Sequence, residues 1–476
     1  MKGNACKLSL RTGAVLALVA TVPANAQFYK QTNLVSDIAG LAQLQDLQLV
    51  NPWGASHSAT SPFWVSNAGK SVSTLYSVNP ITGVVTKSSL IVNVPVPSGQ
   101  VFNGIRSDFT VASGTSSGPS SFIFAGLNGK IYGWNPNVPP PPPSTQAQLG
   151  ATGATPAAYT GIALGLRAGV QFLYGANPAG NRIDVWDRTF TTATLPGTFT
   201  DPTLPAGLVP FNIANIGGSL YVSYTPVNPM VVGPGAINVF DTDGNFIKRF
   251  ATGGPNLQLL DPWGMVVAPA DFGKFANALL VGNFNTGNAA AGPGHISAFS
   301  LAPGADNGKF LGLLEGTDGQ PLSIDGLWQL IFGNGGNGGN PSVLYFAAGI
   351  QNQRHGLFAS LSACHGPVIS GTAASPNVLW PPNNKFVPVT IAYSVTDDCD
   401  AAPACSLSVA VADSGGGINN AADSSMVLDD HTVELRASRN GGGDGRVYTV
   451  EVSCKDKLPL SSSVEVTVTV PHDQGK

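Results

Sequence analysis

The chain has 476 residues, enough for one large domain and a smaller one. Only 11% of the residues are charged, while glycines number 58 and prolines 37. That composition suits strands joined by tight turns and disfavours long surface helices. Hydrophobic residues make up 43% of the chain, which excludes wholesale disorder. The net charge of −4 argues against nucleic acid and anionic membranes as partners.

Residues 1–26 have the pattern of a secretory signal peptide. A basic start precedes an apolar run from Ala14 to Val22 and a small-residue cleavage site at Ala24–Ala26. The apolar run is far shorter than the about 20 residues that a membrane-spanning helix needs. We therefore expect a secreted protein, periplasmic or extracellular, with no membrane span. Loss of the three cations in the signal changes the net charge from −4 to −7.

Four cysteines remain after the signal, all in the C-terminal quarter: Cys364, Cys399, Cys405 and Cys454. An even number in an oxidising compartment, with no CxxC spacing, favours disulfides over zinc. Three pairings are possible, and Cys399 lies near enough to Cys405 for a local hairpin bridge. Cys454 ends a predicted strand and could cross a sandwich to Cys405. We favour Cys405–Cys454, which leaves Cys364 to reach Cys399.

A two-strand unit recurs six times along most of the chain. Its first strands begin near Phe63, Phe122, Phe172, Leu220, Leu279 and Leu344. The spacings of 59, 50, 48, 59 and 65 residues suit four-stranded propeller blades with variable loops. The sequence therefore predicts a six-bladed β-propeller over residues 27–362. The last unit lacks an outermost strand, which the segment Gln31 to Asp37 could supply.

The repeated unit resembles an NHL-type repeat over about residues 30 to 362. Asp261-Pro-Trp-Gly, Leu279-Leu-Val-Gly-Asn-Phe and Gly294-His-Ile-Ser-Ala-Phe match that pattern best. Phrases such as LVNPWG, LLVGNF and LYFAAG are similar to a family of uncharacterised secreted bacterial proteins. That second resemblance implies no assigned activity.

Residues 366–476 predict a small β-sandwich. Runs such as RVYTVEVSC and VEVTVTV alternate apolar and polar residues, as half-buried strands do. The phrase Val395-Thr-Asp-Asp-Cys399 resembles the immunoglobulin-like modules attached to bacterial secreted proteins. The predicted fold is thus all-β: a six-bladed β-propeller followed by an immunoglobulin-like β-sandwich. No residue of the second module suggests catalysis.

Two catalytic-looking motifs lack the context that they need. Residues 114–118 fit G-x-S-x-G, but Ser116 lies in a predicted Ser/Gly-rich hairpin loop and not between a strand and a helix. Residues 333–338 fit G-x-G-x-x-G, but another strand follows where a dinucleotide site needs a helix. We interpret both as turns.

The segments that lead into the six units each carry a small polar residue: Asn51, Asn103, Thr160, Asn212, Asp261 and Asp325. Because first strands line the channel of a propeller, we expect a ring at one mouth. Carboxylate and amide oxygens suit Ca²⁺ or Mg²⁺, so the candidate metal ligands are Asn51, Asn103, Asn212, Asp261 and Asp325. Six-bladed lactonase and esterase propellers hold a divalent cation in this region, which polarises a carbonyl, but this chain lacks the Glu near its first blade and the general base expected of them.

Asn and Asp before Pro or Gly are also routine turn residues, and we favour that structural interpretation of the ring. Three tryptophans occupy the same segments: Trp53, Trp263 and Trp328. We expect them to wedge between blades near the axis, a platform for carbohydrate being the alternative.

Three functions fit these observations. The first is a monomeric binding or scaffold protein for an unknown protein, glycan or small molecule, with no assigned cofactor. The second is a divalent-cation-dependent lactone or ester hydrolase with its site at the channel mouth, where Ca²⁺ is the candidate cation. The third is a structural component of an extracellular matrix or envelope. The absence of a fitting catalytic motif favours the first, and the sequence does not name a ligand.

Overall fold

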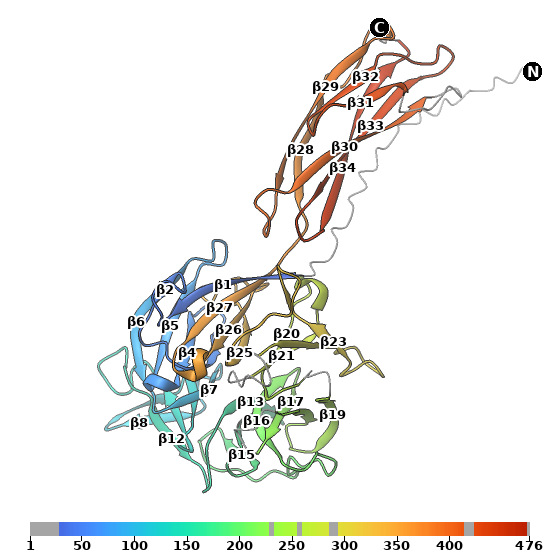
Figure 1. The fold of residues 1–476 in the computed structure, drawn as a ribbon. Helices are drawn as coiled ribbons and strands as arrows, with labels where there is room; N and C mark the ends of the chain where they lie inside the picture. Colours follow the sequence, from blue (N-terminus) through green and yellow to red (C-terminus); the bar gives the residue numbers. More distant parts are fainter. Residues whose placement is uncertain (1–27, 228–232, 255–258, 285–293, 414–422, 474–476) are drawn as a thin grey trace, which may run out of the picture. The chain divides into compact units, whose positions relative to one another are not determined.

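The computed structural model describes residues 28–227, 233–254, 259–284, 294–413 and 423–473 (Figure 1). The predicted signal peptide, residues 1–26, lies outside these ranges. The chain divides into two compact units, with the boundary along the sequence between Cys364 and His365. Strands dominate both units, as the all-β prediction expected. The described residues contain no helix long and apolar enough to cross a membrane.

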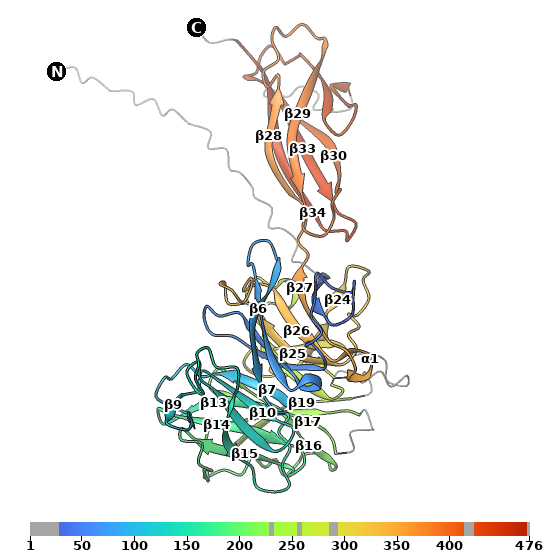
Figure 2. The same cartoon turned by 90° about the vertical axis from the view of Figure 1, so that its left-hand side faces the viewer.

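The described residues of the first unit form six sheets of three or more strands, which follow one another along the chain (Figures 1 and 2), and one two-stranded sheet of β8 (Thr110–Ser113) and β9 (Ser116–Pro119). The first sheet runs β3 (Pro52–Ser56), β4 (Phe63–Asn67), β5 (Val72–Val78) and β6 (Val85–Asn93). The second runs β7 (Pro97–Phe102), β10 (Phe122–Gly126), β11 (Lys130–Trp134) and β12 (Gln148–Thr152). The third has three strands, β13 (Gly161–Arg167), β14 (Val170–Asn177) and β15 (Arg182–Asp187).

The fourth sheet runs β16 (Leu208–Ile216), β17 (Ser219–Pro226), β18 (Ala236–Phe240) and β19 (Phe246–Thr252). The fifth runs β20 (Pro262–Val267), β21 (Leu279–Asn283), β22 (Ile296–Phe299) and β23 (Phe310–Leu313). The sixth runs β25 (Leu327–Phe332), β26 (Leu344–Ala348) and β27 (Leu357–Ala363), then β1 (Phe28–Ser36), with β2 (Leu44–Gln45) and β24 (Glu315–Gly316) beside β1.

A few short elements complete the first unit. The hairpin of β8 (Thr110–Ser113) and β9 (Ser116–Pro119) stands beside the second sheet, and it contains Ser116 as the sequence predicts. The helical turns are η1 (Ala68–Lys70), η2 (Gly273–Phe275) and α1 (Ile350–Gln353).

The N-terminal strand β1 closes the sixth sheet. It pairs antiparallel with β27, from Tyr29 opposite Ala363 to Ser36 opposite Leu357. This pairing is the one predicted for residues 31–37, and it covers an edge that β27 would otherwise expose. Segments from the two ends of the first unit therefore share one sheet.

The innermost strands of the six sheets contact one another in a closed cycle, from β3 through β7, β13, β16, β20 and β25 back to β3. Glycines permit this approach. A Cβ added to Gly54 would lie 2.6 Å from the carbonyl oxygen of Ser98, and one added to Gly99 would lie 2.8 Å from the Cα of Gly161. The innermost strands thus touch backbone to backbone where a side chain has no room.

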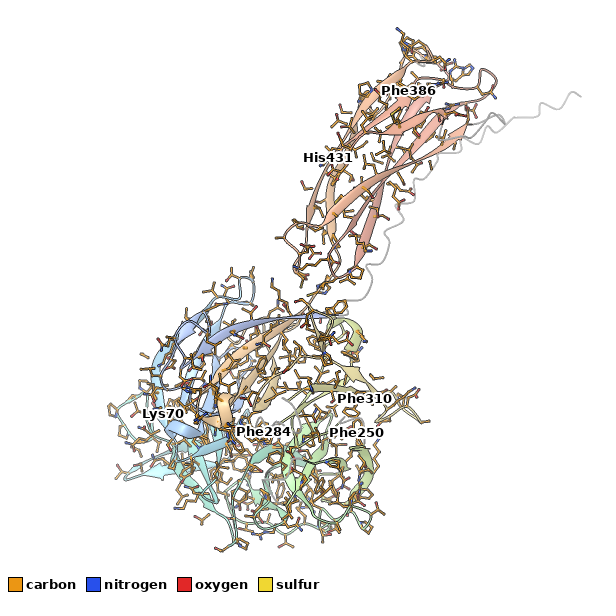
Figure 3. All side chains as sticks on the ribbon, viewed as in Figure 1. Lys70, Phe250, Phe284, Phe310, Phe386 and His431 are labelled. Atoms are coloured by element: carbon orange, nitrogen blue, oxygen red, sulfur yellow. A yellow bond between two sulfur atoms is a disulfide. The ribbon has the colours of Figure 1, made fainter. Side chains whose placement is uncertain are left out.

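Aromatic side chains pack together beside these innermost strands. The ring centroids of Trp53 and Trp328 lie 3.6 Å apart, and those of Phe284 and Trp328 lie 3.7 Å apart (Figure 3 labels Phe284). Trp263 meets both tryptophans edge to face. Trp53 is 6% exposed, and Trp263 and Trp328 are each 1% exposed. They are core residues, and so little exposed surface provides no carbohydrate platform.

The second unit consists of two antiparallel sheets. One runs β28 (Val368–Ser375), β29 (Phe386–Thr396), β32 (Thr432–Arg436) and β31 (Ser425–Val427). The other runs β30 (Ala404–Asp413), β33 (Gly445–Lys455) and β34 (Ser461–Pro471). Side chains from both sheets, including Ile391, Leu435, Tyr448 and Val468, share one buried core.

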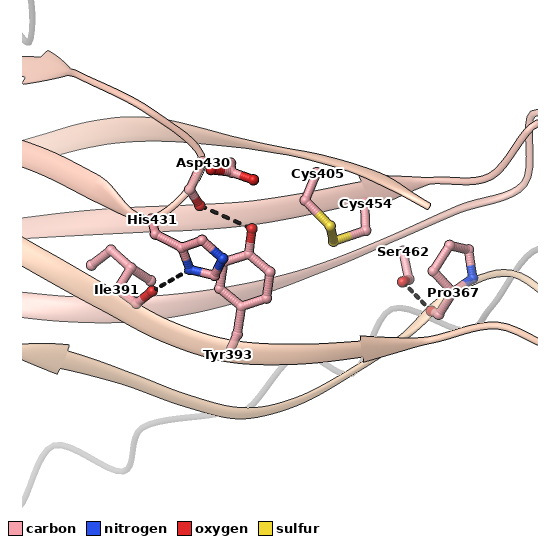
Figure 4. Close-up of a disulfide and its surroundings, with 8 residues drawn as sticks. All are labelled: Pro367, Ile391, Tyr393, Cys405, Asp430, His431, Cys454 and Ser462. Carbon is pink, nitrogen blue, oxygen red and sulfur yellow. Dashed lines mark hydrogen bonds between the residues drawn. A yellow bond between two sulfur atoms is a disulfide. The ribbon is translucent and has the colours of Figure 1, made fainter. Parts of the chain in front are cut away.

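A disulfide joins Cys405 to Cys454, the pair that the sequence analysis favours (Figure 4). The expected route is wrong, however. Cys405 and Cys454 are direct partners on the neighbouring strands β30 and β33, so the bridge lies within one sheet and does not cross the sandwich. Cys364 and Cys399 are disulfide-bonded as well.

Candidate functional site where the innermost strands begin

We call the end of the first unit at which the innermost strands begin the lead-in end. Pro52, Pro97 and Pro262 each pair with the last residue of the neighbouring second strand. The residues just before these prolines have positive φ, which is 47° at Asn51, 39° at Val96 and 47° at Asp261. Three sheets therefore reuse one backbone turn at the lead-in end.

The prediction for Asn103 is wrong. Asn103 follows β7 (Pro97–Phe102), so it lies at the opposite end of an innermost strand from Asn51. Its amide donates to the carbonyls of Asp108 at 3.0 Å and Ser120 at 2.9 Å, and its Oδ1 accepts a backbone N–H two residues along the chain. The equivalent of the Asn51 segment is Val96-Pro-Ser-Gly, in which an apolar residue replaces the polar one.

Thr160 and Asn212 connect neighbouring sheets. The Thr160 hydroxyl donates to the carbonyl oxygen of Phe211 at 2.6 Å. The Asn212 amide donates to the carbonyl oxygen of Trp263 at 2.6 Å, and its Oδ1 accepts the next backbone N–H. Each bond reaches the innermost strand of the following sheet. The Thr160 hydroxyl and both amide atoms of Asn212 are therefore hydrogen-bonded to backbone.

Asp261 is buried, with 8% of its surface exposed. Burial raises its pKa to about 6, while hydrogen bonds from the Thr225 hydroxyl and the Gly233 N–H partly oppose that rise. The cause is loss of hydration and not a second carboxylate. Asp261 is therefore protonated more readily than an exposed carboxyl group, while its Oδ1 accepts a hydrogen bond from the Thr225 hydroxyl.

The donor set does not fit a calcium ion. Such an ion takes roughly six to eight oxygen ligands. Asn103 lies at the opposite end of an innermost strand, and the amide of Asn212 is hydrogen-bonded to backbone. The Asp261 carboxylate accepts hydrogen bonds from Thr225 and Gly233. Among the described residues, no group of three or more His, Cys, Asp or Glu side chains could hold a metal ion.

Asn51 and Asp325 both bond one loop, which the sequence analysis did not single out. We call residues 349–356 the left-handed loop, because Gln351, Asn352 and Gln353 have φ of 53°, 58° and 63°. Asp325 Oδ2 accepts the Gln351 N–H at 2.6 Å. The Asn51 amide donates to Gln353 Oε1 at 3.1 Å. Two residues that precede innermost strands of different sheets thus hold one loop.

Asp37 fixes the other end of this loop. Its Oδ2 lies 2.7 Å from Nδ1 of His355, and its Oδ1 accepts the Gly356 N–H at 2.8 Å. The Asn51 N–H in turn donates to the His355 carbonyl at 3.3 Å. Because Asp37 directly follows β1, the strand that closes the sixth sheet also clamps the loop. The side chains of Gln351, Asn352 and Arg354 remain exposed.

Sequence reasoning missed this loop because its conformation contradicts local preference. Non-glycine residues cost roughly 1–2 kcal/mol each in the left-handed region, so a run of three is not expected from Gln-Asn-Gln. The available signal was a polar run, IQNQRH, bracketed by Gly349 and Gly356 between two apolar strands.

No family model matches the chain. The chain is 30% identical over 312 residues to "Uncharacterized protein R648" of Acanthamoeba polyphaga mimivirus, covering 63% of this chain and 72% of the viral protein. The chain belongs to the family of this viral protein. "Uncharacterized protein L690" of the same virus is 29% identical over 346 residues, covering 70% of this chain and 85% of that protein. Neither protein's name states an activity. Both relatives are viral, whereas the sequence resemblance suggested bacterial relatives.

Solved propeller-type structures resemble the chain weakly. A streptogramin B lyase is 14% identical, covers 70% of this chain and 97% of its own, and has a TM-score of 0.39. The periplasmic gluconolactonase of Pseudomonas aeruginosa is 11% identical, covers 66% and 85%, and has a TM-score of 0.38. An α-L-arabinanase of Penicillium chrysogenum is 10% identical, covers 70% and 98%, and has a TM-score of 0.41. Similarity at this level carries no argument about activity.

Proposed function

We propose that this chain is a secreted binding protein. It consists of a six-bladed β-propeller, residues 27–362, and an immunoglobulin-like β-sandwich, residues 366–476, after removal of residues 1–26. Six successive sheets with cyclic contacts between their innermost strands support the propeller. The Cys405–Cys454 disulfide supports export, because such bonds persist in oxidising compartments.

The left-handed loop carries the proposal of binding. Strained backbone persists only where surrounding structure enforces it, and it clusters at ligand-binding and active sites. Here Asp37, Asn51 and Asp325 enforce it from three different places in the chain. A fixed loop presents Gln351, Asn352 and Arg354 with little conformational freedom left to lose on binding.

The chemistry of this surface suits a polar ligand. The amides of Gln351 and Asn352 each offer both a donor and an acceptor, and Arg354 offers donors only. The Arg354 Nε already donates to the Gln351 carbonyl at 3.1 Å, which orients the guanidinium. A ligand with hydroxyl, carbonyl or carboxylate groups can pair with this set.

The proposal is tested by retention of the purified mature chain on a panel of immobilised oligosaccharides and peptides. The variant Asn352→Gly/Arg354→Ala removes two exposed side chains and keeps the three anchors of the loop. We expect the parent chain to be retained by at least one ligand, with loss of at least about tenfold in affinity in the variant.

The matched control is Thr115→Ala/Ser117→Ala, two exposed residues at the β8–β9 hairpin. This control should bind like the parent chain. Retention that is equal in the loop variant, or absent from every ligand for the parent, contradicts a binding role for the loop.

A further inference from the structure

The end of the first unit opposite the lead-in end contains a cavity of about 650 Å³. Its walls are the hairpin that joins β5 to β6 and the turn between β25 and β26, which contributes Gly336 and Asn337. The cavity lies wholly within described residues. Its volume falls within the roughly 300–1,000 Å³ of small-molecule sites.

Hydrogen bonds hold both walls in place. The Val78 N–H donates to the carbonyl oxygen of Asn337 at 2.9 Å, which joins the hairpin to the turn. The Asn334 amide donates to the carbonyls of Ser58 and Ser61, both at 2.8 Å. The Oδ1 of Asn79 accepts two backbone N–H groups of the hairpin tip at 2.9 and 3.0 Å. The cavity is therefore formed before any ligand arrives.

The lining offers hydrogen bonds but no charge. Ser77 and Thr86 are direct cross-strand partners, so their hydroxyls share one face of the hairpin. In the described part of the chain, these two hydroxyls and the Asn79 Nδ2 make no side-chain hydrogen bond. Pro80 and Val84 add apolar surface, and none of the lining residues is ionisable.

We propose that this cavity binds one neutral sugar residue, a site separate from the left-handed loop. Hydroxyls and amides both donate and accept, as do the hydroxyl groups of a sugar. The apolar C–H surface of a sugar ring can lie against Pro80 and Val84. None of the lining residues offers an opposite charge to pair with a charged ligand.

The test is saturation-transfer NMR titration of the mature chain with methyl glycosides of glucose, galactose, mannose and xylose. Glucuronic acid, glucosamine and a blocked tri-alanine peptide are titrated in parallel. We expect saturable binding of at least one neutral glycoside and none of the charged sugars or the peptide. Binding only of a charged sugar or of the peptide, or of no probe, overturns the proposal.

Two variants place the binding in the cavity. Ser77→Ala/Thr86→Val removes two hydroxyls, and Asn79→Asp keeps the turn acceptor while replacing the donor with a charge; each should weaken binding by roughly tenfold or more. The control Ser89→Ala changes an exposed residue of β6 outside the cavity and should leave affinity unchanged. Asn352→Gly/Arg354→Ala should also leave it unchanged, which separates this site from the loop. Unaltered affinity in both cavity variants refutes the assignment.

Discussion

At the scale of single residues, several strained backbone positions and the buried carboxyl group of Asp261 lie at the lead-in end. Asn51 and Asp261 hold the same positive φ ahead of proline, and Gln351, Asn352 and Gln353 continue the left-handed pattern in the loop. The hydrogen bonds of Asp37, Asn51 and Asp325 offset this strain. Whether a substitution at these positions raises or lowers the free energy of unfolding should therefore depend on how well the new residue tolerates positive φ, and not on its side-chain contacts.

Asn352→Gly should raise the free energy of unfolding by up to about 1 kcal/mol, because glycine adopts positive φ without a Cβ penalty. Asn352→Ala should lower it, since alanine tolerates this region less well than asparagine. Chemical denaturation of the three proteins checks the order. An Ala variant as stable as the Gly variant would mean that the loop stores no strain.

Asp261 should make stability depend on pH. Its pKa is raised from 3.8 to about 6, so the folded state holds the proton more tightly than the unfolded chain does. The contribution of the protonated group is present at low pH and is lost as pH rises through about 6. Asp261→Asn mimics the protonated acid, so its stability relative to the parent should rise by up to about 3 kcal/mol between pH 4 and pH 7.

Urea unfolding at both pH values measures this difference. The control Asp306→Asn changes a carboxylate whose side chain is 65% exposed and should show little such change. A relative stability of Asp261→Asn that is the same at pH 4 and pH 7 contradicts the raised pKa of Asp261.

At the scale of elements, the closing strand β1 decides whether the ring of sheets is complete. Leu34 is 1% exposed and packs in the core beside the first and sixth sheets, whereas Gln31 of the same strand points outward. Leu34→Ala should lower the free energy of unfolding by about 2–5 kcal/mol. Gln31→Ala should change it by less than about 0.5 kcal/mol. Equal thermal unfolding of both variants would show that β1 does not contribute to closure.

The lead-in segments also determine the response to calcium. A calcium site occupied at about 100 times its Kd would add about 2.7 kcal/mol of stability. Because these carboxyl and amide groups already bond the left-handed loop, Thr225 or a neighbouring sheet, we expect the same unfolding temperature in excess Ca²⁺ and in excess EDTA. A calcium-dependent rise that disappears in Asp261→Asn/Asp325→Asn would restore the metal-site hypothesis.

The positions of the strands were predictable from the sequence, but the hydrogen-bond partners of the polar side chains were not. The six apolar strands that begin near Phe63 through Leu344 all occur, because period and composition report burial directly. Asn103 was misplaced because the sequence around it resembles the segments that precede the other innermost strands. The register of β7 with β10 shows that the equivalent position is Val96. The left-handed loop could not be predicted, since its shape depends on Asp37, more than three hundred residues earlier.

At the scale of the whole molecule, the first unit combines a closed set of innermost strands with a fixed loop at one end and a cavity at the other. The second unit has its own core and a disulfide within one sheet. Its aromatic pair of Tyr393 and His431, stacked at 4.3 Å, lies near that disulfide in Figure 4. Each unit therefore has its own hydrophobic core between or within its sheets.

The most direct test of the account is hydrogen exchange, measured by mass spectrometry, of the mature chain with and without the ligand that the immobilised panel identifies. Amides of a bound segment exchange more slowly because local opening is suppressed. The account predicts protection of residues 349–356 and of the segment around Asn51, with the second unit unchanged. Protection elsewhere, with residues 349–356 exchanging at the same rate, would contradict the left-handed loop as the binding site.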